Sequence, residues 1–127
     1  KRFLKKNILK KLLKYRIEVH VRSIFLQGLL LENYDSLKKQ FLPWKDLFLR
    51  WNNYCIKYQM SKLQAATNFV FNNNIVRKVI VGFANIGQFD EFLSLRMSKN
   101  KKIPIFKVKK QKNIEKLIKP YNWNFNK

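Results

Sequence analysis

The residues best placed to do chemistry lie between positions 82 and 91, where a short apolar stretch gives way to a helical pattern. Residues 77–81 are β-branched and apolar at their centre, which predicts a strand, and Gly82 ends it. Asn85 is a common helix-capping residue, and apolar residues recur at helical spacing after it. The first turn of a helix carries unpaired backbone N–H groups that bind anions. The pattern therefore fits a phosphate-binding loop and an ordinary tight connection equally well.

Two other residue types that commonly carry chemistry occur singly. His20 is the only histidine and Cys55 the only cysteine, so a metal cluster or a histidine-based triad lacks a second member of its kind. We therefore predict no metal site. Residues 17–23 alternate apolar and polar side chains, which places His20 on the polar face of a strand. We expect His20 to be hydrogen-bonded to neighbours, with a catalytic role as the alternative.

The segment of residues 77–93 resembles the last strand, loop and helix of the aldo/keto reductases, which follow the pattern VIVG-x-x-N-x-x-Q-L-x-E-N. The matching residues are Gly82, Asn85, Gln88 and Glu91. Two positions depart from the pattern: Ala84 replaces serine and Phe92 replaces asparagine, and each change removes a polar contact. In the family this segment lies against the adenosine phosphate of a nicotinamide cofactor.

A second segment resembles the end of the seventh strand in the same family, with its pattern Y-S-P-L-x-x-G-L-L. Ser23, Phe25 and Gly28 match, as do the two leucines that follow. Arg22 occupies the position where the family commonly has an aromatic ring that stacks on the nicotinamide. A planar guanidinium also stacks on rings. Arg22 is therefore expected either to stack on the cofactor or to pair with an acidic residue elsewhere in the protein.

The resemblance covers roughly residues 8–95 and implies an α/β fold, namely a partial (β/α)₈ TIM barrel with its last two βα units. Residues 17–25 would be the seventh strand and residues 76–82 the eighth, parallel and adjacent, with both carboxyl ends on one rim. The implied cofactor on that rim is NADP(H), with NAD(H) possible. The implied cofactor-binding residues are Arg22, Ser23, Phe25, Gln27, Gly82, Ala84, Gln88, Glu91 and Phe92.

The implied activity is hydride transfer between NADP(H) and a carbonyl or alcohol substrate. The family carries its catalytic tyrosine, lysine, aspartate and histidine on earlier strands, and none of those motifs occurs here. The resemblance therefore implies a C-terminal fragment of a reductase that has no catalytic residue of its own and is inactive alone. Its small-molecule carbonyl substrate would bind through the missing half. A cytoplasmic location is expected, because a single cysteine builds no disulfide framework.

The length of the chain and the spacing of its apolar residues limit the folds that it can form. The chain of 127 residues is about half of the roughly 250 that a complete barrel needs, and it begins inside an amphipathic pattern, so we expect a fragment. Residues 1–97 are expected to form the barrel portion, and residues 98–127 a solvated, lysine-rich extension. We predict helices over 3–13, 44–58, from 61 to the asparagine run at 72–74, and from 86 onward. The second has an apolar face made by Leu47, Phe48, Trp51, Cys55 and Tyr58. Ser61, with Gln64 three residues later, forms a capping box at the start of the third, whose expected core face includes Leu63, Ala66, Phe69 and Val70. The first helix is expected to pack on the sheet, and strand 77–81 to be buried on both faces.

The formal net charge of +21 gives an alternative function. Residues 1–16 contribute +8 and residues 96–127 contribute +10, whereas the residues between them contribute only +3. Dense positive charge attracts nucleic acids and anionic membrane surfaces. The alternative is thus a small basic module that binds one of these and has no enzymatic activity. The reductase interpretation predicts no nucleic-acid or membrane partner and leaves the oligomeric state open.

Overall fold

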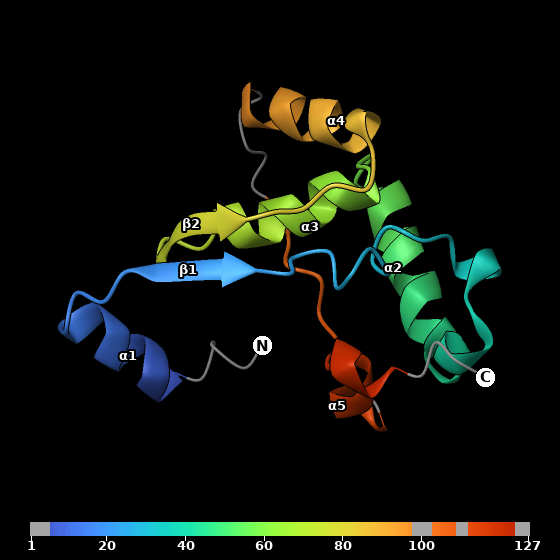
Figure 1. Cartoon of the computed structure of the whole chain (residues 1–127), viewed down its shortest axis with the longest axis horizontal. Coiled ribbons are helices and arrows are strands. Elements are labelled where there is room, and N and C mark those ends of the chain that lie inside the picture. Colours follow the sequence, from blue (N-terminus) through green and yellow to red (C-terminus); the bar gives the residue numbers. More distant parts are fainter. Residues whose placement is uncertain (1–5, 98–102, 109–111, 124–127) are drawn as a thin grey trace.

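The computed structural model describes residues 6–97, 103–108 and 112–123. The chain combines several helices with a small two-stranded parallel sheet (Figure 1), so the predicted α/β class is confirmed at that level. The elements are α1 (Lys6–Lys14), β1 (Val19–Arg22), α2 (Lys45–Lys57), α3 (Lys62–Phe71), β2 (Val76–Ile80), α4 (Ile86–Met97) and α5 (Ile114–Leu117). Short 3₁₀ helices span Tyr34–Ser36, Lys39–Trp44 and Pro120–Asn122.

The two strands are adjacent and parallel, as the sequence predicted. His20 pairs with Lys78, and Arg22 pairs with Ile80. The connection from β1 to β2 contains α2 and α3 (Figure 1). Because parallel strands point the same way, the loops that follow β1 and β2 leave the sheet at the same edge.

One face of the sheet is covered and the other is open. The valines of both strands are partly buried, and α3 packs against β2. The opposite face presents His20, Arg22, Lys78 and Ile80. Ile80 is 60% exposed. The prediction that this strand is buried on both faces is therefore wrong for the described residues, in which no further element covers the open face.

The helix pair between the strands builds most of the core. The predicted apolar face of α2 is confirmed, since Leu47, Phe48, Trp51 and Cys55 are buried. Ser61 caps α3 by accepting a hydrogen bond from the N–H of Gln64 at 2.9 Å, which confirms the predicted helix start. Phe69 was expected on the core face of α3, but it is 41% exposed.

The C-terminal segment packs onto α2 instead of extending into solvent. Phe106 contacts the rings of Trp51 and Tyr54, with centroids 5.2 and 5.3 Å away. Leu117, in α5, is only 2% exposed. The Trp44 indole donates a hydrogen bond to the carbonyl of Lys112 at 3.3 Å. The expectation of a solvated tail is therefore wrong for residues 103–108 and 112–123.

Helix α1 projects beyond the sheet instead of packing on it (Figure 1). Ile8 is 42% and Leu13 is 64% exposed, so the predicted docking of this helix on the sheet is wrong for the described residues. The helix ends at Lys14, and Arg16 just beyond it adopts a left-handed conformation with φ of 53°. The N–H of Ile17 then bonds to the carbonyl of Leu12 at 2.9 Å. Residues 3–5 of the predicted helix lie outside the described residues.

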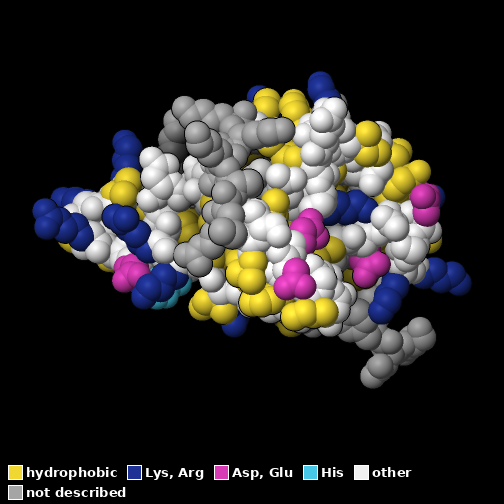
Figure 2. Space-filling model, turned by 90° about the horizontal axis from the view of Figure 1, so that it is seen from above, with side chains coloured by type: hydrophobic (Ala, Val, Ile, Leu, Met, Phe, Trp, Pro, Cys, Tyr) yellow, Lys and Arg dark blue, Asp and Glu magenta, His cyan; other side chains and the backbone are white. Residues whose placement is uncertain are grey.

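Basic side chains dominate the end of the molecule that holds α1 (Figure 2). The visible acidic side chains are fewer and more scattered (Figure 2). Within the described ranges, no helix combines the length and the apolar composition needed to cross a membrane.

Candidate functional site

Two hydrogen bonds shape the loop between β2 and α4. The Asn85 Oδ1 accepts from the backbone N–H of Gln88 at 3.0 Å. The Gln88 Oε1 in turn accepts from the backbone N–H of Ala84 at 3.0 Å. Asn85 is therefore the N-cap of α4, as its residue type predicted. The two bonds fix the loop conformation at the entrance to the helix.

The first turn of α4 leaves two backbone donors available. In the part of the chain that the structure describes, the N–H groups of Ile86 and Gly87 have no hydrogen-bond acceptor. They lie at the N-terminus of α4, where the helix dipole adds a partial positive charge. A Cβ placed on Gly82 would have no other atom within 4 Å, so the space beside the strand exit is open. Residues 82–87 thus combine open space at the strand exit with unpaired donors at the helix start.

The loop that follows β1 adopts an unusual backbone conformation. Ser23, Leu26 and Gln27 have φ of 59°, 51° and 55°, and Gly28 has φ of 82°. A residue other than glycine costs roughly 1–2 kcal/mol in this left-handed region. Since Ser23 already leaves the extended conformation, β1 ends at Arg22, before the predicted boundary at residue 25. The surrounding structure holds this loop in a specific shape.

Aromatic side chains join the two loops. Phe25 is buried in the core, and its ring lies 6.4 Å from that of Phe83. The Phe83 ring also lies 5.5 Å from Phe89 and 5.2 Å from Phe92 in α4. Phe25 and Phe92 thus pack within the protein, and their contact with a cofactor stays a prediction.

A hollow of about 400 Å³ opens between α2, α3 and α4. Gln88 and Glu91 of α4 line it, together with Ser61 and Lys62 at the start of α3. The Ser61 hydroxyl donates a hydrogen bond to the Glu91 carboxylate, which joins the two helices. The Lys62 ammonium donates to the Asn33 Oδ1 at 2.9 Å. The apolar part of the lining comes from Leu31, Cys55, Ile56, Met60 and Leu63.

Cys55 lines this hollow, and its burial affects the ionisation of its thiol. Its side chain is buried, and burial raises the pKa of the thiol from 9.0 to about 11, while Lys62 acts in the opposite direction. The thiolate is the nucleophilic form of cysteine. The thiol is therefore protonated at neutral pH and behaves as a small apolar side chain.

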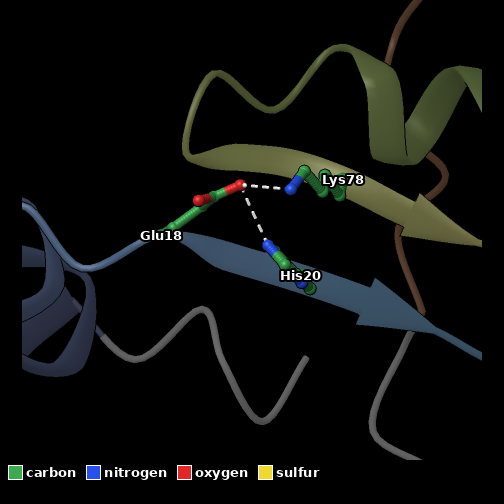
Figure 3. A network of polar contacts seen from close by, with 3 residues as sticks. All are labelled: Glu18, His20 and Lys78. Atoms are coloured by element: carbon green, nitrogen blue, oxygen red, sulfur yellow. Dashed lines mark hydrogen bonds and ion pairs between the residues drawn. The ribbon is translucent and has the colours of Figure 1, made fainter.

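A polar network occupies the open face of the sheet (Figure 3). The Glu18 Oε1 lies 2.9 Å from the His20 Nε2 and 3.4 Å from the Lys78 Nζ. The pKa of Glu18 lies below its ordinary value of 4.5. The hydrogen bond with His20 is the largest cause, and the interaction with Lys78 adds to it. The prediction that His20 is hydrogen-bonded to a neighbour is confirmed.

The predicted site residues fall into two groups. Gln88 and Glu91 line the hollow, with Gly82 and Ala84 in the loop before them. Arg22, Ser23 and Gln27 are exposed on or just after β1, and none of them lines the hollow.

The sequence interpretation missed Lys62 and Asn33. Both line the hollow, and the bond between them joins residues 29 positions apart. Local spacing carries no signal for such a contact. Ser61 was identified only as a helix cap, and its bond to Glu91 likewise depends on how α3 and α4 pack.

Comparison of the chain with models of protein families, with curated proteins and with solved structures yields no match. Among the described residues, no group of three or more histidine, cysteine, aspartate or glutamate side chains is placed to hold a metal ion. The case for a function therefore rests on the local geometry of the two loops and the hollow.

Proposed function

We propose that this chain supplies the last two βα units of a (β/α)₈ barrel of the aldo/keto reductase type, and that residues 82–92 bind the adenosine phosphate end of NADP(H). The activity of the whole protein is hydride transfer between this cofactor and a carbonyl or alcohol. One observation carries the proposal. Two adjacent parallel strands end at one edge of the sheet, and Phe25 and Phe83 join the loops that follow them. A cofactor that spans two neighbouring βα units requires such an edge.

The donors at the start of α4 and the hollow suit different parts of the adenosine phosphate end of the cofactor. The N–H groups of Ile86 and Gly87 suit a phosphate, because they are unpaired and lie at a helix N-terminus. The hollow is large enough for part of a small ligand. Its mixed lining offers apolar contact and the polar groups of Gln88 and Glu91 to the adenosine.

The catalytic residues and most of the substrate contacts belong to the earlier strands of such a barrel. Residues 6–97 would then position the cofactor, and the 127-residue chain alone would not reduce a carbonyl. The amide of Gln88 is a neutral donor near the proposed phosphate site, and its carbonyl already serves Ala84. A neutral donor discriminates weakly, so we expect a preference for NADP(H) with NAD(H) accepted. A ratio of kcat/KM above about a thousandfold would exceed the contribution of one such contact.

The test is titration of the full-length protein and its Gly82→Val variant with NADP⁺. The added side chain has no steric conflict within the protein at its Cβ, so the fold is expected to persist while phosphate approach is blocked. We expect Kd to rise at least about tenfold, the effect of losing one charged hydrogen bond. Asn74→Val is the matched control, since it introduces the same side chain at an exposed turn before β2. This turn lies at the opposite end of that strand from Gly82. Equal affinity in wild type and Gly82→Val would contradict the phosphate assignment.

The charge distribution supports a second candidate, a basic module that binds nucleic acid or an anionic membrane surface. The exposed Ile8 and Leu13 of α1 and the basic end of the molecule favour it (Figure 2). Such binding weakens steeply with salt, because phosphate contacts release counterions. Strong salt-dependent binding to a nucleic acid or to anionic vesicles, without any dinucleotide binding, would favour this candidate over the reductase.

A further inference from the structure

An arginine without an acidic partner lies where β1 meets the loop at the carboxyl edge of the sheet. Arg22 is the last residue of β1, is exposed, and lies on the open face opposite Ile80. Within the described ranges it forms no ion pair. Ile80, the residue opposite Arg22 in the strand register, is apolar and cannot neutralise the guanidinium.

We propose that Arg22 binds an anionic group, a carboxylate or a phosphate, on the carbonyl substrate. This inference rests on the proposed reductase function, because only there does the carboxyl edge of the sheet adjoin the reaction site. The guanidinium presents paired N–H donors in a planar fork that matches the two oxygens of a carboxylate or phosphate.

The other charged groups on the same face are already paired, which leaves this role to Arg22. Glu18 is the acidic residue of this network, and it is engaged by His20 and Lys78 (Figure 3). His20 precedes Arg22 by two residues on the strand, which corresponds to roughly 7 Å. Lys78 lies opposite His20 in the strand register, and it already forms an ion pair with the carboxylate of Glu18. The positive charge at the carboxyl edge is therefore uncompensated among the described residues.

The position of Arg22 is well suited to substrate and less suited to the oxidised cofactor. A guanidinium stacked on a nicotinamide would place two positive charges together after hydride transfer, which costs free energy. A substrate anion at the same place would instead be attracted to the guanidinium whether the cofactor is oxidised or reduced. Ser23, directly after the arginine, is left-handed and ends the strand, so Arg22 lies at the carboxyl edge of the sheet.

The experiment compares two pairs of aldehydes with the full-length protein: succinic semialdehyde with butanal, and glyceraldehyde 3-phosphate with glyceraldehyde. We measure the ratio of kcat/KM for the anionic over the neutral member of each pair. In Arg22→Gln this ratio is expected to fall about 10- to 100-fold for one pair, mainly through KM, as expected for a lost charge-assisted hydrogen bond. The affected pair identifies the anion as carboxylate or phosphate. Arg22→Lys should recover part of the loss, and Arg77→Gln, which removes another exposed arginine on β2, should leave the ratio unchanged.

Two outcomes would overturn the inference. If Arg22→Gln lowers kcat/KM equally for both members of each pair and weakens NADP⁺ binding, then Arg22 acts on the cofactor. If the ratios do not change at all, then the substrate anion is bound elsewhere. A separate NADP⁺ titration of the unsubstituted protein distinguishes these results from failure of the reductase proposal, which would show as absence of dinucleotide binding.

Discussion

Asn85 and Gln88 connect helix stability with ligand binding at the level of single residues. The Asn85 side chain satisfies the N–H of Gln88, and the Gln88 side chain satisfies the N–H of Ala84. These bonds use two donors that a ligand would otherwise meet, and they leave the N–H groups of Ile86 and Gly87, in the first turn of α4, without an acceptor among the described residues. The cap therefore selects which backbone groups face an incoming anion.

The substitution Asn85→Ala should lower the free energy of unfolding by about 1 kcal/mol, the usual value for loss of an N-cap side chain. Urea denaturation measures this change. Asn85→Asp is the matched control, because aspartate caps a helix as well as asparagine does. The introduced carboxylate would however place a negative charge beside the proposed phosphate, so this variant should keep its stability and lose NADP⁺ affinity. An Asn85→Ala protein as stable as the wild type would contradict the capping role.

Cys55 should resist alkylation at pH 8 in the folded protein. Burial raises the pKa of its thiol from 9.0 to about 11, and this reduces the thiolate fraction by roughly a hundredfold. The pKa of this thiol is higher in the folded protein than in the unfolded chain, which loses its thiol proton first as the pH rises. The free energy of unfolding should therefore fall between pH 9 and about pH 11. The measurement is the rate of reaction with iodoacetamide, with and without urea. Equal rates in both conditions would show that the thiol is not buried.

At the scale of elements, the C-terminal segment is an integral part of the core around α2. Leu117 of α5 shares a cluster with Phe41, Leu47 and Phe48. Phe106 packs against the rings on the neighbouring part of α2. Loss of this segment would expose aromatic side chains of α2 that lie on the apolar face of that helix.

Leu117→Ala should therefore lower the free energy of unfolding by about 2–5 kcal/mol, the range for truncating a buried leucine. Leu42→Ala is the control, because Leu42 is 46% exposed and its truncation should cost much less. Urea denaturation of both variants measures the difference. Similar small changes in both would mean that α5 does not contribute to the core.

Elements with strong local signals were predictable, and their packing was not. Asn85 and Ser61 were identified as helix caps because capping depends on residues within one turn. The burial of Leu117 was missed because it depends on contacts with α2 and the 3₁₀ helix before it, which are distant in the sequence. The exposure of Ile80 was missed for a related reason. An apolar strand pattern predicts two covered faces, but it does not say which elements supply the cover.

In the whole molecule, the two-stranded sheet has free edges. β1 and β2 pair only with each other in the described chain, and Ile80 is exposed on the open face. Parallel sheets are normally covered on both faces, and unpaired edges bind other chains. This geometry accords with the proposal that the strands belong to a larger barrel.

The 127-residue chain alone is accordingly expected to self-associate at moderate ionic strength. High salt should increase the association, because it screens the repulsion between chains of net charge +21. Sedimentation velocity at several salt concentrations measures it. A clean monomer at every concentration, with a single sharp unfolding transition, would argue for a self-sufficient domain and against the barrel proposal.

We propose that the start of α4 binds the phosphate of a dinucleotide. The most direct measurement of this binding is an NMR titration of the ¹⁵N-labelled full-length protein with NADP⁺. We predict that the amide signals of Ile86 and Gly87 shift most and saturate together, while those of Asn73 and Asn74, before β2, stay in place. Unchanged Ile86 and Gly87 signals at a saturating NADP⁺ concentration would contradict it.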